Sequence, residues 1–285
     1  MEINHILIAG AGTMGNGIAQ VAATSGYLVT CVDILPAALE KARAAIDRST
    51  NKLVEKGIIT SQQKAAADKI SFASSYEEVA KAEFIIEAAT ENPELKFKIF
   101  KELDATARDG IIIASNTSSI SITKIAAHTK RPDKVIGMHF MNPVPLMTLV
   151  EIIKGLATSD ETLRTALDIC RRLGKTPVEA NDSPGFISNR ILCPMINEAI
   201  FALQDNVGTP EAIDTVMKLG MNHPMGPLAL ADLIGLDVVL FVMEVLQRDL
   251  GEDKYRPAPL LRKMVDAGYL GKKSGQGFYK YKTQA

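Results

Sequence analysis

A histidine and a glutamate bracket the segment HFMNPVPLMTLVE, which contains two prolines and no other charged residue. They are His139 and Glu151. A carboxylate beside an imidazole orients the ring and stabilises its protonated form. Such a pair can take the proton of a hydroxyl group while a nicotinamide takes hydride from the same carbon. The segment therefore predicts an acid–base pair, and a core histidine bonded to a nearby acid is the alternative.

The other histidines are scattered along the chain, and no metal-ligand spacing connects them. They are His5, His128 and His223. We predict ordinary structural roles for these three residues and no metal site.

A nucleotide-binding pattern occupies the start of the chain. Gly10, Gly12 and Gly15 follow the apolar run INHILIAG in the order G-x-G-x-x-G, and a helical segment after them ends at Gly26. A second apolar run, YLVTCVD, ends in Asp33. The glycines let the chain turn tightly and let a pyrophosphate approach the backbone at a helix N-terminus. A tight turn without a ligand is the alternative, but strand, helix and acid in register favour dinucleotide binding.

The residues around Asp33 favour NAD over NADP. A carboxylate at this position accepts hydrogen bonds from an adenosine ribose and repels a 2′-phosphate. The segment ILPAA that follows contains no arginine or lysine to bind such a phosphate.

The elements that must position these residues alternate between helix and strand over the first half of the chain. We predict helices from Pro36 to Lys56 and in NPELKFKIFKEL. Capping-box pairs that begin further helices are Thr60 with Gln63 and Ser75 with Glu78. The apolar runs FIIEAA, GIIIAS and KVIGMHF are predicted strands. This alternation predicts a mainly parallel sheet.

Ligands of such sheets bind beyond the carboxyl ends of the strands. Each of four polar residues follows a predicted strand, so we expect them to lie near one another. They are Glu91, Asn116, Ser118 and His139.

The character of the sequence changes near Asp182. The segment NDSPGFISNRI contains Pro184 and Gly185, which suggest a hinge, and helical patterns follow it. The sequence thus predicts an α/β fold: a Rossmann-type, mainly parallel sheet domain at 1–183, followed by an all-α domain at 184–285. The predicted helix 235–250 is apolar around much of its circumference, so it is buried either in its own core or against a second subunit.

Composition narrows the class of protein. The chain has 285 residues, 47% hydrophobic and 23% charged, with a net charge of −1, values typical of a soluble globular protein. The charge balance indicates neither a nucleic-acid nor a membrane partner, and we expect neither a secretory leader nor a membrane span. The three cysteines are far apart and odd in number, which favours a reducing compartment, so we expect a cytoplasmic protein.

From end to end the chain resembles the 3-hydroxyacyl-CoA dehydrogenase family. The resemblance rests on the motifs GAGTMGNGIAQ, SNTSSI, HFMNPVPLMTLVE, DSPGFISNRIL, HPMGPLALADLIGLD and SGQGFYKYK. It implies an N-terminal NAD domain and a C-terminal helical domain through which two subunits pair. It also implies interconversion of (3S)-hydroxyacyl-CoA and 3-ketoacyl-CoA. The similarity is greatest to the stand-alone short-chain members, which act on (S)-3-hydroxybutyryl-CoA and acetoacetyl-CoA.

The resemblance implies a role for each matching residue. His139 corresponds to the base and Glu151 to its partner. Ser118 would hydrogen-bond the reacting oxygen and help to place the nicotinamide, and Asn189 would donate to the substrate. The implied cofactor contacts are Gly10, Gly12, Thr13, Met14, Gly15, Asp33, Glu91, Lys96, Asn116, Ser118, Asn142 and Lys273.

The implied contacts to coenzyme A are Ser49 and Lys56, which share one helix. An ammonium group suits a phosphate, although a solvated lysine that complements the helix dipole is the alternative for Lys56.

Two other functions remain open. One is a β-hydroxyacid dehydrogenase with a lysine base, but the corresponding stretch offers Asn189 and Arg190 instead. The other is a relative that kept the fold and lost turnover, as lens crystallins related to this family did. The intact Ser118, His139, Glu151 and Asn189 argue against the second alternative.

Overall fold

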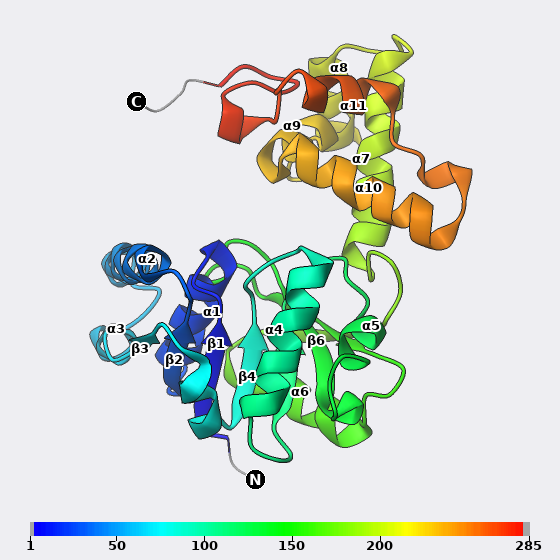
Figure 1. Cartoon of the computed structure of the whole chain (residues 1–285). Helices are drawn as coiled ribbons and strands as arrows, with labels where there is room; N and C mark the ends of the chain where they lie inside the picture. The colour runs from blue at the N-terminus through cyan, green and yellow to red at the C-terminus, as the bar shows by residue number, and fades with distance from the viewer. Residues whose placement is uncertain (1–2, 282–285) are drawn as a thin grey trace. The chain divides into compact units, whose positions relative to one another are not determined.

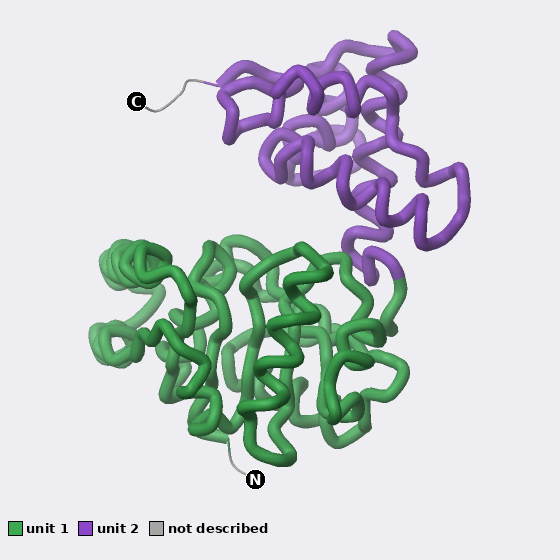
Figure 2. The backbone as a smooth tube through the Cα atoms, in the orientation of Figure 1, with its two compact units in different colours: residues 1–183 green, residues 184–285 purple. Residues whose placement is uncertain are grey.

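The structure is a computed structural model that describes residues 3–281. The chain divides into two compact units, residues 1–183 and 184–285 (Figure 2). Each unit has its own hydrophobic core, and each is described by itself below.

The first unit contains an eight-stranded sheet in the order β3-β2-β1-β4-β5-β6-β7-β8. Its strands are β1 His5–Ala9, β2 Leu28–Val32, β3 Ser71–Ala73, β4 Phe84–Glu87, β5 Ile112–Ser115, β6 Val135–Phe140, β7 Leu149–Lys154 and β8 Thr176–Asn181. Every neighbouring pair is parallel except β6 with β7. The Rossmann-type, mainly parallel sheet predicted from the sequence is therefore confirmed.

Helices cover both faces of this sheet (Figure 1). They are α1 Thr13–Thr24, α2 Pro36–Glu55, α3 Ser61–Ala67, α4 Pro93–Thr106, α5 Ile122–Ala126 and α6 Asp160–Arg172. On one face Ile6 and Ile8 of β1 share a core with apolar residues of α1 and α6. On the other face α4 and α5 lie together, with α5 against β6. Helix α4 begins where Asn92 accepts a hydrogen bond from the Leu95 backbone amide and Pro93 occupies the first turn.

The two predicted capping boxes had different outcomes. Thr60 and Gln63 form the reciprocal box at the start of α3, which confirms that prediction. The box predicted for Ser75 and Glu78 was wrong, because the chain forms a short 3₁₀ helix, Tyr76–Lys81, at this point. In that tighter turn Ser75 accepts from the backbone amide of Glu77, while the Glu78 carboxylate pairs with Lys81 at 3.0 Å.

The second unit is helical over its described part, residues 184–281. Its helices are α7 Ser188–Gln204, α8 Pro210–Thr215, α9 Pro227–Ile234, α10 Leu236–Leu250 and α11 Pro259–Asp266. Only isolated β-bridges occur there, within 271–280, so the all-α prediction is confirmed. Helix α10 buries Val239, Met243 and Leu246 in the core of this unit but leaves Val238 41% and Phe241 39% exposed. Among the described residues no helix is long and apolar enough to cross a membrane.

Candidate active site

The antiparallel pairing of β6 with β7 places His139 directly opposite Glu151. The Nδ1 atom of His139 lies 2.7 Å from Oε2 of Glu151, and the two residues are only 8% and 1% exposed. Side chains directly opposite each other in an antiparallel pair are within contact distance. The sheet register therefore holds the pair together, and proton exchange between the imidazole and a substrate would use the other ring nitrogen, Nε2.

Asn116 connects the end of β5 to the strand that carries His139. Its side-chain oxygen accepts a hydrogen bond of 2.9 Å from the backbone amide of Phe140. Its backbone amide donates to the backbone carbonyl of Glu87. These bonds position Asn116 beside the imidazole-bearing strand.

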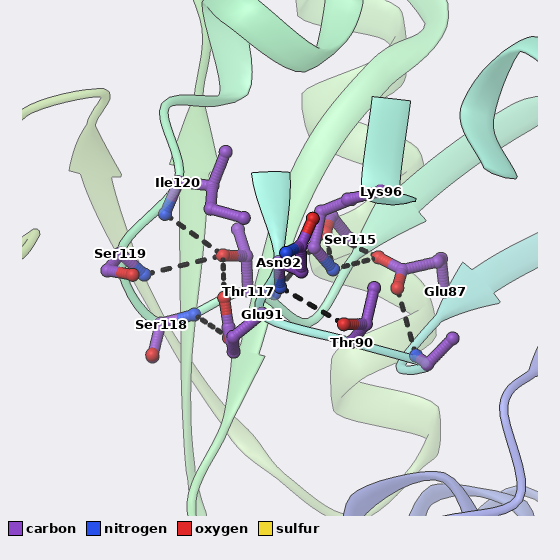
Figure 3. Close-up of polar contacts among 11 residues, drawn as sticks. Glu87, Thr90, Glu91, Asn92, Lys96, Ser115, Thr117, Ser118, Ser119 and Ile120 are labelled. Atoms are coloured by element: carbon purple, nitrogen blue, oxygen red, sulfur yellow. Dashed lines mark hydrogen bonds and ion pairs between the residues drawn. The ribbon is translucent and has the colours of Figure 1, made fainter. Parts of the chain in front are cut away.

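The segment after β5 is tied to the segment after β4 by Glu91 (Figure 3). One carboxylate oxygen of Glu91 accepts from the Ser118 backbone amide at 2.7 Å, and the other accepts from the Thr117 hydroxyl at 2.8 Å. The Thr117 hydroxyl in turn accepts from the Ile120 amide at 3.0 Å. The structure thus brings Glu91 next to Ser118 at the carboxyl end of the sheet.

Lys96 is one of the predicted cofactor contacts, and that role stays a prediction. Its side chain is 1% exposed, and its ammonium group pairs with the Glu87 carboxylate beneath the two segments. The Ser115 hydroxyl donates to the same carboxylate at 2.8 Å. Sequence reasoning did not single out Glu87 or Ser115. The available signal was a glutamate at the end of the otherwise apolar run FIIE.

The glycine loop leaves space where a dinucleotide would need it. A Cβ atom on Gly15 would lie 1.8 Å from the Gly10 carbonyl oxygen, so Gly15 is required for packing, whereas a Cβ atom on Gly12 would meet nothing within 4 Å. Gly12 precedes α1, whose N-terminus has no side-chain cap and no acidic residue in the first turn. Open space beside uncapped amides, including those of Thr13 and Met14, fits an approaching pyrophosphate.

Asp33 is half-buried at the end of β2. Its carboxylate accepts a hydrogen bond of 2.9 Å from the Ala11 amide and another of 3.0 Å from the Leu35 amide. The same carboxylate therefore fixes the glycine loop and remains available to ribose hydroxyls through its other lone pairs.

The connection between β6 and β7 carries Asn142, which is exposed. Val144 packs against α1, because a Cβ atom on Gly17 would lie 2.9 Å from Val144 Cβ. The buried ammonium group of Lys175 donates to the Val144 and Met147 carbonyl oxygens at 2.6 and 2.7 Å. Burial lowers the pKa of Lys175 from its usual value. Sequence reasoning did not single out this lysine, which holds the connection in place.

The remaining predicted residues lie outside this arrangement. Ser49 is half-buried on α2 and Lys56 is exposed at the end of that helix. Asn189, near the start of α7, and Lys273 belong to the second unit, and Lys273 Nζ lies 2.6 Å from the Asp237 carboxylate. Their roles at the site stay predictions. Residues 3–281 contain no group of three or more side chains that could hold a metal ion.

Comparison with known proteins gives one consistent result. Residues 5–183 match the family model of the 3-hydroxyacyl-CoA dehydrogenase NAD binding domain, and residues 185–281 match that of its C-terminal domain. A probable 3-hydroxybutyryl-CoA dehydrogenase of Bacillus subtilis is 56% identical over 285 residues, covering 100% of this chain and 99% of the relative. The human mitochondrial hydroxyacyl-coenzyme A dehydrogenase is 40% identical, covering 98% of this chain and 92% of that protein. The crystal structure of (S)-3-hydroxybutyryl-CoA dehydrogenase from Ralstonia eutropha superposes with a TM-score of 0.96 at 53% identity, covering 99% of this chain and 100% of that one.

Proposed function

The chain belongs to the 3-hydroxyacyl-CoA dehydrogenase family, and from that premise we propose that it interconverts (S)-3-hydroxybutyryl-CoA and acetoacetyl-CoA with NAD. The observation that carries this proposal is the buried pair of His139 and Glu151, 2.7 Å apart in the same unit as the glycine loop. Alcohol oxidation needs both a hydride acceptor and a base for the hydroxyl proton. The unit contains the residues for both requirements.

The glycine loop at 10–15 would hold the pyrophosphate of NAD, and Asp33 would accept from the adenosine ribose. Bound there, the nicotinamide supplies hydride transfer to or from the substrate carbon. Asn116, Ser118, Glu91 and Asn142 are the further proposed contacts in this unit. The space beside Gly12 and the uncapped start of α1 support this assignment.

His139 is the proposed acid–base group. In the oxidation direction its Nε2 atom takes the hydroxyl proton as the C–H bond breaks, and in the reduction direction the protonated ring returns it. Glu151 holds Nδ1 and stabilises the charged imidazole. Ser118 and Asn189 are the proposed donors to the reacting oxygen, where charge develops during the reaction.

The two units have different proposed tasks. Residues 1–183 bind NAD and, through Ser49 and Lys56 on α2, coenzyme A. Residues 184–285 contribute Asn189 and Lys273, complete the substrate site and pair two subunits. The partly exposed apolar residues Val238 and Phe241 of α10 support a homodimer, since such interfaces have apolar centres. The buried free cysteines are compatible with a cytoplasmic enzyme.

An absorbance assay tests the activity. With acetoacetyl-CoA the protein should oxidise NADH, and turnover should be slower with longer 3-ketoacyl-CoA thioesters and with NADPH. Turnover of free β-hydroxyacids in preference to the thioesters would support the lysine-base alternative. Cofactor binding without any turnover would support the non-catalytic one. Either result would overturn the proposal.

Light scattering at micromolar concentration tests the assembly. The parent should be a homodimer, and Phe241→Glu should weaken it because a charge would be buried at the interface. The exposed Glu161→Gln variant on α6 is the matched control. A monomeric parent would overturn the assembly proposal and leave the activity proposal unaffected.

A further inference from the structure

We propose that Asp232, a buried carboxylate on α9, is a positioning residue for the cofactor site. It holds residues 271–281, which we call the C-terminal loop, and this loop carries Lys273. The inference rests on the proposed function, which assigns Lys273 to NAD. Asp232 is only 1% exposed, and the C-terminal loop contains most of the motif SGQGFYKYK.

The Asp232 carboxylate accepts three hydrogen bonds from the C-terminal loop. Its Oδ1 atom accepts from the backbone amide of Phe278 at 3.0 Å. Its Oδ2 atom accepts from the backbone amide of Tyr279 and from the Tyr281 hydroxyl, each at 3.0 Å. Hydrogen bonds to a charged acceptor are stronger than those between neutral groups, and a buried carboxylate that loses them is costly. The carboxylate therefore ties the loop firmly to α9.

Two glycines let the C-terminal loop approach Asp232 closely. Gly271 has a φ of 88°, and a Cβ atom there would lie 2.3 Å from the Asp232 carbonyl oxygen. A Cβ atom on Gly277 would lie 1.9 Å from Asp232 Oδ1. A side chain at either position would collide with Asp232, and the positive φ at Gly271 also favours glycine. The loop can therefore dock on Asp232 in this way only with glycine at both positions.

A second buried carboxylate, Asp214 on α8, connects α9 to the same loop (Figure 1). It is 6% exposed. It accepts from the Leu228 and Ala229 amides in the first turn of α9, at 2.8 and 2.9 Å. It also accepts from the Tyr279 hydroxyl at 2.8 Å. The start of α9 and the C-terminal loop are therefore fixed to one side chain, which limits movement of the loop relative to Asp232.

The position of Lys273 follows from the position of the loop. Residues 272–274 form a single 3₁₀ turn, and the Gly271 amide donates to the Gln276 carbonyl oxygen at 2.8 Å across it. From this turn Lys273 Nζ lies 2.6 Å from the carboxylate of Asp237, in the first turn of α10, and the lysine side chain is 47% exposed. A lysine side chain loses conformational entropy when it is ordered by a ligand. A fixed backbone lowers that cost, so it should strengthen the contact with an anionic cofactor.

Four variants test the inference: Tyr281→Phe, Asp232→Asn, Lys273→Met, and the double variant that combines the last two. A fluorescence titration measures the Kd of NADH for each. Lys273→Met should raise this Kd by about 10-fold or more, because a hydrogen bond to a charged group is lost. Asp232→Asn and Tyr281→Phe should each raise it by about 3- to 10-fold, because each removes neutral-range hydrogen-bond energy from the loop.

The double variant separates positioning from a merely structural role. If Asp232 acts through Lys273, the two changes are coupled and their effects do not add. Asp232→Asn should then change the Kd of NADH by less than about twofold in the Lys273→Met protein. Independent effects would instead multiply. The inference is overturned by full multiplication of the two single effects, or by a parental Kd in Lys273→Met.

Tyr269→Phe and Asn197→Ala are the controls in the same unit. Tyr269 precedes the C-terminal loop and is 40% exposed. Asn197 is 3% exposed and secures a different segment, since it donates to the Arg256 carbonyl at 3.0 Å and accepts from the Ala258 amide at 2.8 Å. Both variants should keep the parental Kd of NADH, although Asn197→Ala should lower the melting temperature. An equal loss of affinity in Asn197→Ala would show that any damage to this unit weakens binding, which would overturn the inference.

Hydrogen exchange without cofactor provides a readout that needs neither NADH nor turnover. The amides of Phe278 and Tyr279 should exchange faster in Asp232→Asn and Tyr281→Phe than in the parent, and at the parental rate in Tyr269→Phe. Unchanged exchange in Asp232→Asn would overturn the inference. A parent that binds NADH without reducing acetoacetyl-CoA would overturn the proposed function and leave these binding and exchange ratios as the test of Asp232.

Discussion

Two buried pairs of ionisable side chains lie near the carboxyl end of the same sheet, and they differ in the chemistry that they can support. His139 and Glu151 face each other across the antiparallel strands β6 and β7. Lys96 and Glu87 join helix α4 to the parallel strand β4. An imidazole exchanges its proton near neutral pH, whereas an ammonium group normally keeps it. The first pair is therefore suited to proton transfer and the second to holding a fixed geometry.

The hydrogen bonds of the carboxylates support this division. The described bonds of Glu87 lead to the backbone and side chains of two neighbouring segments, so its loss should disturb positions. The Glu151 carboxylate pairs with the imidazole, so its loss should disturb a charge. The variants proposed next change His139, then Glu151, and then two charged residues outside both pairs, Asp33 and Lys175.

Removal of the imidazole should have the largest effect. His139→Gln should lower turnover by roughly 10²–10⁴-fold, the range for loss of a positioned acid–base group. The Kd of NADH should stay close to the parental value, because the glycine loop and Asp33 are unchanged. Steady-state kinetics and a separate NADH titration provide the two measurements.

His128→Gln is the control for this variant. The ring of His128, in the same unit, stacks on the ring of Phe97 with 4.1 Å between the ring centroids. The proposed reaction gives His128 no role. The variant should therefore retain parental turnover. A His139→Gln protein that turned over normally, or that failed only because NADH no longer bound, would show that the acid–base assignment is wrong.

Removal of the carboxylate charge should have a smaller effect. Glu151→Gln keeps an oxygen that can accept from Nδ1, so the ring keeps its orientation and loses its negative neighbour. Reduction of acetoacetyl-CoA needs the protonated ring, which a neighbouring carboxylate stabilises. Steady-state kinetics in that direction should therefore show a kcat below that of the parent, with a smaller loss than in His139→Gln. A parental kcat would contradict the role given to Glu151.

Asp33 is a carboxylate without a cationic partner among residues 3–281, so it differs from the carboxylates of both pairs. Asp33→Ala should reduce the preference for NADH over NADPH by about 10- to 100-fold, measured as the ratio of the two kcat/KM values. The variant loses the hydrogen bonds from the ribose hydroxyls of NADH to a charged group. It also loses the repulsion between that group and the 2′-phosphate of NADPH. The exposed Asp168→Ala variant on α6 is the control. An unchanged ratio in Asp33→Ala would remove Asp33 from the cofactor site.

Much of this arrangement could be predicted from local sequence patterns. The glycine loop, the strands FIIEAA, GIIIAS and KVIGMHF, and the pairing of His139 with Glu151 were all recognisable because apolar runs and special residues mark them. By contrast, β8 was not predicted. Four of its six residues are exposed at the edge of the sheet, so it has no apolar run to mark it.

Other features depend on tertiary contacts that no local pattern encodes. The antiparallel register, and not the stiffness of the two prolines alone, sets the distance between His139 and Glu151. The burial of Lys96 depends on Glu87 and Ser115 meeting it from two separate strands. From the sequence alone, a lysine near the start of a helix looks like an exposed surface residue, because its buried partners lie elsewhere in the chain.

Lys175 is the converse of Asp33, a buried ammonium group with two carbonyl partners and no carboxylate partner among residues 3–281. Burial lowers its pKa below the usual 10.5. Between the lowered value and 10.5 the unfolded chain therefore binds more protons at this residue than the folded chain. Stability contributed by Lys175 must then rise with pH across that interval.

Replacement of this lysine should have the smallest effect on turnover of the four changes. Lys175→Met leaves the Val144 and Met147 carbonyl oxygens without their donor, which should cost about 1–3 kcal/mol of unfolding free energy at neutral pH. Urea unfolding at fixed protein concentration should show that the stability advantage of the parent grows as the pH rises from neutral toward 10.5. The exposed Lys98→Met variant on α4 should differ from the parent in unfolding free energy by an amount that does not change with pH.

A stability advantage of the parent over Lys175→Met that shrank with rising pH would mean that the folded protein binds the Lys175 proton more tightly than the unfolded chain does. The ammonium group would then have a compensating negative partner, and it would belong with the paired charges at this end of the sheet.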